Sequence, residues 1–200
     1  MSFTMAHDVT MYLMTFAILL ATYIIVERSL YFGATLREGK AVDHYLRNHK
    51  KDKELRSELM EQFRSGKSPQ AQVLFEVAEA ADLPQGEMEY FVQSVYIAKQ
   101  EILSKRLWIL DTIVTLSPLM GLLGTILGII DAFHSLSSGQ GAADPAGVSR
   151  GIGTALFATG FGILIALYSM MFYNYFTNKV EQVNNQIKLI SLTFLASRGS

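Results

Sequence analysis

Two threonines lie deep inside long apolar stretches, where a hydroxyl is one of few groups that can meet a proton or an ion. Thr125 lies in the stretch 116–133, and Thr159 lies in the stretch 151–176. A threonine in a membrane helix usually donates a hydrogen bond to the carbonyl four residues back in its own helix. The alternative is that both hydroxyls line a polar path and relay protons or coordinate an ion. The residues alone leave both interpretations open.

Carboxylates are absent from the middle of every long apolar stretch. Asp111 lies near one end of the apolar run 108–133 and Asp131 near the other. Proton relays inside membranes normally use ionisable groups. We therefore expect that, if this chain conducts, a partner protein brings the acid.

Other kinds of chemistry have little support in the sequence. The chain has no cysteine, its four histidines are scattered, and its net charge is −1. The glycine-rich segment G-Q-G-A-A-D-P-A-G is not followed by G-K-[ST], so it does not match a phosphate-binding loop. We expect no enzymatic activity, no metal, no cofactor and no nucleic-acid partner.

Small residues recur at helical spacing in the same two stretches. They are Gly121, Gly124 and Gly128 in the first, and Ala158, Gly162 and Ala166 in the second. Helices in lipid associate where small residues let their backbones approach. So many small residues favour contacts with several neighbours, as in a ring. Ordinary packing within one subunit is the alternative.

Three apolar runs are long enough to cross a bilayer, which needs about 20 residues. They are residues 9–26, 108–133 and 151–176, and residues 134–150 join the last two. The first run lacks the basic stretch and cleavage site of a signal peptide, so a membrane span is favoured. The sequence predicts an all-α integral membrane protein with three transmembrane helices, the second and third extended into a cytoplasmic helical domain.

Basic residues predict the orientation of these spans. Residues 28–106 contain 13 of the 17 Lys and Arg, and the tail 177–200 contains three. The positive-inside rule places residues 27–107 and 177–200 in the cytoplasm. It places residues 1–8 and 134–150 on the periplasmic side. The N-terminus is therefore expected outside and the C-terminus inside, with lipid around the spans.

The polar segment between the first two spans is expected to form helices. An apolar stripe of Leu55, Leu59 and Phe63 predicts one helix over 52–65. Ser68-Pro69 is a typical helix start. A further helix begins near Glu87 and is expected to enter the second span unbroken. Its apolar face is predicted from Met88, Phe91, Val95, Ile102 and Leu103.

A seam of apolar residues follows the third span. Val180, Val183, Ile187, Ile190 and Phe194 alternate at spacings of three and four, as in a coiled coil. The predicted partner of this seam is the apolar face of residues 87–107, because both segments leave the membrane on the same side.

The paired apolar stretches resemble the MotA/TolQ/ExbB proton channel family, most closely its ExbB/TolQ branch. The resemblance is carried by P-L-M-G-L-L-G-T-I-L-G-I-I-D-A-F, by G-I-G-T-A-L-F-A-T-G-F-G-I-L-I-A-L, and by the following Y-N. Its specific part is about 60 residues, from 117 to 174. Three spans also fit this branch, whereas flagellar MotA-type subunits have four.

The resemblance implies a motor subunit of the bacterial inner membrane. Such subunits form a pentameric ring around a dimer of a single-span ExbD- or TolR-like protein, whose aspartate takes protons in turn. The work passes to a TonB- or TolA-like energy transducer. Thr125 and Thr159 fall on the family's G-T and A-T motifs, whose threonines face the pore. The transported species is H⁺, and no cofactor is implied.

One departure from the family pattern bears on ion selectivity. Relatives often read G-I-x-E-A-L at the start of the third span, and Thr154 stands here in place of that glutamate. Tyr168 likewise replaces a proline that relatives often carry. The ring is then expected either to use the partner's aspartate alone or to couple to Na⁺. A TolQ-like role and a non-conducting membrane scaffold are the remaining alternatives.

Overall fold

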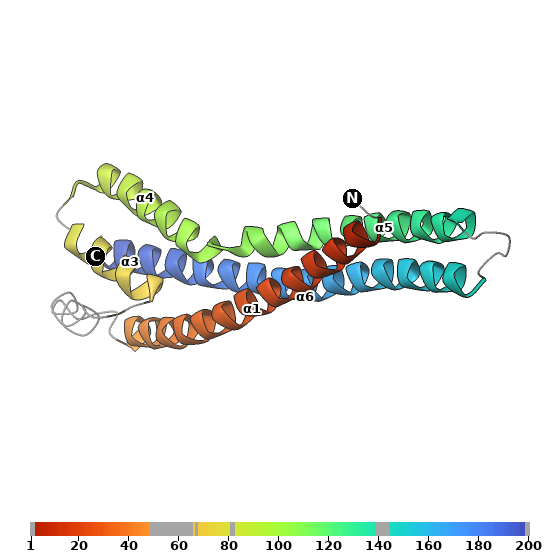
Figure 1. Ribbon diagram of the computed structural model, residues 1–200. Helices are drawn as coiled ribbons and strands as arrows, with labels where there is room; N and C mark the ends of the chain where they lie inside the picture. Colours follow the sequence, from red (N-terminus) through yellow and green to blue (C-terminus); the bar gives the residue numbers. More distant parts are fainter. Residues whose placement is uncertain (1–2, 49–65, 67, 81–82, 139–144, 199–200) are drawn as a thin grey trace. The chain divides into compact units, whose positions relative to one another are not determined.

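The computed structural model describes residues 3–48, 66, 68–80, 83–138 and 145–198, and within them it contains helices and no strand (Figure 1). The helices are α1 (Phe3–Asn48), α3 (Pro69–Glu79), α4 (Gln85–Ser104), α5 (Leu107–Ser138) and α6 (Pro145–Arg198). The prediction of an all-α protein is confirmed. The helix predicted over 52–65 lies outside the described residues.

Three of these helices are long and apolar enough to cross a membrane. The candidate spans are His7–Val42 in α1, Leu107–His134 in α5 and Pro145–Thr193 in α6. Each extends beyond the apolar run from which it was predicted. Because α5 continues to Ser138 and α6 begins at Pro145, the segment between them is shorter than the predicted loop. Pro118 lies inside α5, which continues past it.

The chain divides into two units. Unit 1 comprises Met1–Val26 and Arg106–Asn174, and unit 2 comprises Glu27–Lys105 and Tyr175–Ser200. The helices α1 and α6 each contribute to both units, whereas α5 belongs to unit 1 and α3 and α4 belong to unit 2. Unit 1 therefore holds the paired apolar stretches, and unit 2 holds most of the polar segment.

Unit 2 is built where α3 meets α1 and α6. The predicted start of α3 is confirmed: Ser68 caps the helix, and its Oγ accepts a hydrogen bond from the backbone N–H of Ala71 at 3.3 Å. The backbone N–H of Ser68 donates to Glu38 Oε2 of α1 at 2.7 Å. The buried Gln70 donates from Nε2 to Gln186 Oε1 of α6 at 2.9 Å. These polar contacts fix α3 against two long helices.

The apolar seam of α6 is buried as its spacing predicts. Its buried members are Val180, Val183, Ile187 and Ile190, and the side chain of Phe194 lies outside the described part. At the start of this segment, Phe176 stacks on Phe32 of α1 with ring centroids 5.9 Å apart. The described contacts thus join α6 to α1 and α3. Its pairing with α4 stays a prediction.

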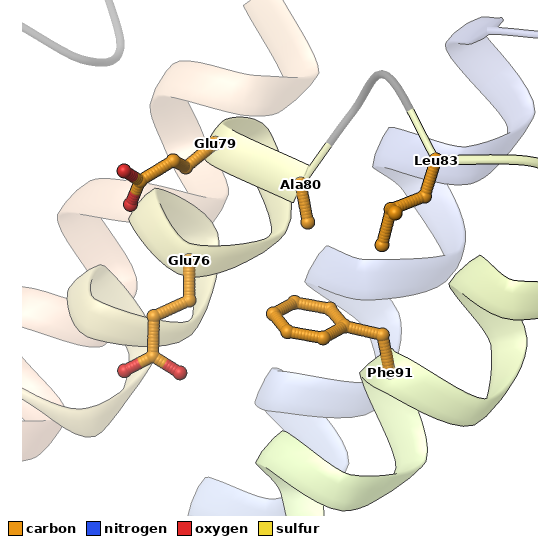
Figure 2. A pocket seen from close by; sticks show the side chains of 5 residues that line it. All are labelled: Glu76, Glu79, Ala80, Leu83 and Phe91. Atoms are coloured by element: carbon orange, nitrogen blue, oxygen red, sulfur yellow. The ribbon is translucent and has the colours of Figure 1, made fainter.

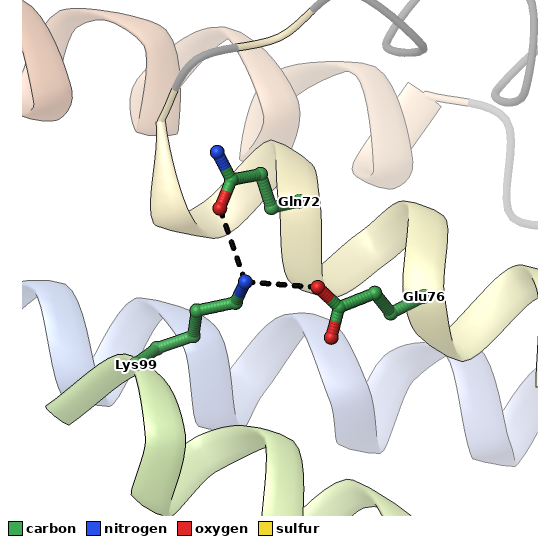
Figure 3. A network of polar contacts seen from close by, with 3 residues as sticks. All are labelled: Gln72, Glu76 and Lys99. Carbon is green, nitrogen blue, oxygen red and sulfur yellow. Dashed lines mark hydrogen bonds and ion pairs between the residues drawn. The ribbon is translucent and has the colours of Figure 1, made fainter. Parts of the chain in front are cut away.

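The helix α4 shows the predicted apolar face with one exception. Met88, Val95 and Leu103 are buried, but Ile102 is 47% exposed. On its polar side α4 reaches α3, where Lys99 Nζ donates to Gln72 Oε1 at 3.0 Å and to Glu76 Oε1 at 2.8 Å (Figure 3). This network ties α4 to α3 through long side chains.

The prediction that the helix from Glu87 enters the second span unbroken is wrong. The helix α4 ends at Ser104, α5 begins at Leu107, and Arg106 between them has φ 67°. A residue in this left-handed region cannot continue a right-handed helix. The buried Arg28 donates from Nη2 to the Lys105 carbonyl oxygen, and its guanidinium lies 5.4 Å from the ring centroid of Tyr31. Arg28 therefore supplies a partner for a carbonyl at the break.

Candidate functional site

The helices α5 and α6 pack so closely that a side chain larger than hydrogen does not fit at several glycine positions between them. A Cβ atom added at Gly162 would lie 2.5 Å from the carbonyl oxygen of Ser117, and one at Gly121 would lie 3.0 Å from that of Ala158. Gly124 and Gly128 face Ala158 and Ala155 in the same way, with added Cβ atoms 2.7 and 2.8 Å from the alanine Cβ atoms. Ala166 is also buried. The small residues therefore serve a contact within one chain.

Two further glycines of α6 have no such neighbour. A Cβ atom added at Gly153 or Gly160 would meet no atom within 4 Å. The single-chain contact thus accounts for much of the small-residue pattern and leaves these two positions open. Some small residues therefore pack within the subunit, and Gly153 and Gly160 are open to contact with a neighbouring chain.

Thr159 joins the two helices through a hydrogen bond. Its Oγ1 donates to the carbonyl oxygen of Gly121 at 3.0 Å, so it does not make the usual bond within its own helix. A hydroxyl that donates once keeps its lone pairs for a proton donor or a cation. The half-buried Thr159 is therefore a packing residue that can still present an oxygen to a ligand.

Thr125 lies one turn of α5 beyond the glycine that accepts from Thr159. Residues four apart are neighbours on a helix surface, so Gly121 and Thr125 share a face. The Oγ1 of Thr125 donates to the Leu122 carbonyl oxygen at 2.6 Å, which is a bond within its own helix. Thr159 therefore contacts α5 one turn away from Thr125, and an ion pathway that uses both threonines requires such proximity.

Thr154 is not part of this arrangement. It is exposed, and its Oγ1 donates to the Gly151 carbonyl oxygen of its own helix at 3.0 Å. Five residues separate it from Thr159, which corresponds to about 140° around an α-helix. Thr154 and Thr159 therefore point to different sides of α6, and Thr154 faces away from the Thr159–Gly121 bond.

The outer face of α5 is strongly apolar, and the described residues leave it uncovered. Its exposed residues include Leu116, Leu119, Leu123, Ile126 and Ile130. A surface of this kind requires lipid or another protein chain. Unit 1 is therefore suited to the interior of a membrane.

A hollow of about 500 Å³ lies in unit 2, between the end of α3 and the start of α4 (Figure 2). Its lining residues are Glu76, Glu79, Ala80, Leu83 and Phe91. Across the described residues, His, Asp and Glu side chains form no group of three that could hold a metal ion.

Sequence reasoning missed two contacts that shape the structure. The carbonyl of Gly121 serves as an acceptor for Thr159, and Arg28 binds the carbonyl at the end of α4. For the Gly121 contact the signal is the pattern G-x-x-x-T, from Gly121 to Thr125. It puts a glycine, which permits a close approach of two helices, one turn from a hydroxyl. The Glu27-Arg28 pair at the end of the first apolar run is a weak signal for the second.

Comparisons with known proteins agree with the motifs. The model of the MotA/TolQ/ExbB proton channel family matches residues 48–189. An ExbB-like biopolymer transport protein of Synechocystis sp. is 29% identical over 185 residues, which cover 88% of this chain and 87% of that protein. The biopolymer transport protein ExbB of Aquifex aeolicus is 34% identical over 95 residues, 48% of this chain and 62% of its own.

A TolQ protein of the Tol-Pal system is also among the relatives. That of Pseudomonas aeruginosa is 34% identical over 103 residues, which cover 50% of this chain and 44% of the TolQ chain. The family match covers more than half of the chain, and three helices are apolar enough to cross a bilayer. This chain is a membrane protein that belongs to the MotA/TolQ/ExbB proton channel family.

Proposed function

We propose that this chain is a ring subunit of an ExbB/ExbD-type motor in the bacterial inner membrane. The motor uses the proton motive force to energise a process at the outer membrane, such as TonB-dependent uptake. The observation that carries the proposal is the Thr159–Gly121 bond beside Thr125, at the level where α5 and α6 pack most closely. The bond supports a shared pathway because it joins Thr159 to α5 one turn away from the second hydroxyl, that of Thr125.

Because the three spans have no carboxylate at mid-depth, the partner must supply one. Thr125 and Thr159 can coordinate or relay an ion, but neither can hold a charge at neutral pH. A single-span ExbD- or TolR-like partner with a membrane aspartate completes the pathway, and a TonB- or TolA-like protein receives the work. Several copies of this chain, five by family resemblance, surround that partner. Each charge moved provides about 2.3 kcal/mol per 100 mV.

The proposed orientation follows from the basic residues. The N-terminus lies in the periplasm, and residues 27–107 and the end of α6 lie in the cytoplasm. The proposal takes H⁺ as the transported ion. The lack of an acid in the middle of the three spans supports a variant in which Na⁺ is transported, because hydroxyl and carbonyl oxygens can bind hard cations.

Ion flux through the reconstituted complex tests the proposal. The chain and its single-span partner are placed in vesicles, and flux is measured in matched proton and sodium gradients. Proton flux without Na⁺ would remove the sodium variant. No flux of either ion, with an intact complex, would reject the motor and leave a non-conducting scaffold.

Thr159→Val is the substitution that tests the pathway most directly. We expect flux to fall by at least about tenfold while the complex still assembles, since one hydrogen bond between membrane helices contributes only about 1 kcal/mol. Thr22→Val is the matched control, because Thr22 Oγ1 donates to the Ile18 carbonyl oxygen within α1. Normal flux in Thr159→Val would reduce Thr159 to a packing residue.

A TolQ-like role in envelope integrity and division is the second candidate. It is favoured by the similarity to the TolQ protein of P. aeruginosa. The two roles differ in partner, so co-purification with the ExbD-like and TolR-like proteins of the same cell separates them. Stable recovery with the TolR-like protein alone would replace the first proposal with the second.

A further inference from the structure

Asp111 is an ionisable residue inside the candidate span of α5. It is the fifth residue of a helix that begins at Leu107, and it is exposed. Within the described part of the chain, its carboxylate makes no hydrogen bond or ion pair. Charged side chains in membrane helices almost always face a protein interior or a water-filled cavity. Its exposure in the single chain therefore calls for a polar environment provided by the assembly.

Asp111 shares one side of α5 with Thr125. The residues Asp111, Thr115, Pro118, Leu122 and Thr125 follow one another at spacings of four and three, which forms a single stripe along a helix. The stripe runs beside the Gly121–Gly128 side of α5 that packs on α6, with Thr125 at the edge of that side, and all five residues are exposed or half-buried. We call these five residues the Asp111 stripe.

The Asp111 stripe is also distinct from the most apolar side of α5. That side carries Leu116, Leu119 and Leu123, which are 49%, 60% and 48% exposed. Thr115, by contrast, donates from Oγ1 to the backbone oxygens of Asp111 and Thr112 at 3.2 and 3.0 Å. One surface of α5 suits lipid, and the stripe beside it suits water and ions.

We propose that the Asp111 carboxylates line the cytoplasmic mouth of the ion pathway and concentrate cations there. The proposal rests on the proposed function, because that function makes the side of α5 with Thr125 face the lumen of a ring. Rings of carboxylates attract cations at the entrances of cation-conducting pores. The carboxylate acts by its charge on the approaching ion, and the partner's acid still carries the proton through the membrane.

The absence of cysteine allows a direct test of the charge at this mouth. Thr115→Cys is introduced into the full complex in membranes, and cationic and anionic methanethiosulfonate reagents are applied from the cytoplasmic side. We expect the introduced thiol to be modified, and the cationic reagent to react faster than the anionic one. Adding Asp111→Asn should slow the cationic reagent and accelerate the anionic one by about fivefold each, the size expected for one charge about 4 Å away in water, so their rate ratio should fall by about 25-fold. The effect should shrink at high ionic strength.

Two variants serve as controls. Asp131→Asn makes the same chemical change at the far end of α5 and off the Asp111 stripe, so the rate ratio should stay unchanged. Leu119→Cys lies on the apolar side and should react more slowly than Thr115→Cys. A Thr115→Cys that resists both reagents, or an Asp111→Asn without effect on the ratio, overturns the proposal. The modification rates are measured without ion flux. If the proposed motor function itself is wrong, this is seen independently, because the unmodified complex conducts no ion.

Discussion

The contact between α5 and α6 in unit 1 and the contact between α3 and α4 in unit 2 use opposite means. The first depends on the absence of side chains, since an added Cβ at Gly162 would lie 2.5 Å from a backbone oxygen. The second depends on long side chains, because Lys99 reaches 2.8 Å to Glu76 and 3.0 Å to Gln72. The α5–α6 contact brings two backbones close together, and the α3–α4 contact is made by long polar side chains.

The solvent explains this difference. Lipid offers helices little apolar driving force for association, so close packing and backbone hydrogen bonds must hold them together. Water drives apolar faces together and fills the spaces they leave, so α3 and α4 tolerate the hollow between Glu79 and Phe91. The comparison predicts that unit 1 is sensitive to volume and unit 2 to charge and hydrogen bonding.

The largest expected effect is that of Gly162→Val. The new side chain would meet the backbone of Ser117 and Gly121, which has no rotamer to change. We expect a loss of about 3 kcal/mol in the free energy of unfolding in detergent. Gly160→Val is the control, since a Cβ there meets nothing within 4 Å. Equal destabilisation by both variants would show that volume at the α5–α6 contact is not the cause.

Arg28→Met should have the next largest effect. It leaves the Lys105 carbonyl without this donor at the end of α4, and a part-buried hydrogen bond from a charged group contributes about 2 kcal/mol. Hydrogen exchange of the amides at 104–107 should accelerate. Arg37→Met alters an exposed arginine of the same helix and should leave that exchange unchanged. Unchanged exchange in Arg28→Met would mean that the break persists without Arg28.

Arg106→Gly should be more stable than Arg106→Ala. Arg106 has φ 67°, which glycine adopts freely and other residues adopt at a cost of about 1 kcal/mol. Arg106→Ala removes the same side chain but keeps the backbone cost. We expect the glycine variant to exceed the alanine variant by about 1 kcal/mol in the free energy of unfolding. Equal stabilities would indicate that the backbone at this position is relaxed.

Lys99→Met should have the smallest effect. Its ion pair with Glu76 is partly exposed, and such pairs contribute below about 1 kcal/mol. A double-mutant cycle with Glu76→Gln measures the coupling between the two side chains. The coupling should decrease in high salt, whereas the effect of Gly162→Val should not. A coupling that is large and independent of salt would contradict the proposed contrast between the units.

Local chemistry made some features predictable. The start of α3 follows from Ser68 and Pro69, whose effects reach only one turn. The close approach of α5 and α6 follows from small residues at helical spacing. The spacing could not show that Gly162 meets Ser117 of the same chain, because a neighbouring copy offers the same residues.

Long-range contacts limited the other predictions. The break between α4 and α5 contains no glycine or proline, and Arg28, which binds its carbonyl, is 77 residues away in the sequence. The hydrogen bond of Thr159 likewise crosses 38 residues to another helix, where a local rule pointed to its own. Sequence patterns identified Thr159 but neither the break nor Arg28, and in both places the partner is set by tertiary structure.

The α5–α6 contact also has a consequence for biogenesis. Its members, such as Gly128 with Ala155 and Ala132 with Gly151, come from two helices that follow each other in the chain. Membrane helices can associate once both have been inserted, and contacts between successive helices form fastest. The hairpin can therefore mature cotranslationally, before a second copy is available. Assembly of the proposed ring would then need only to join finished hairpins, and Gly153 and Gly160 are positions where an added Cβ meets nothing within the chain's described part.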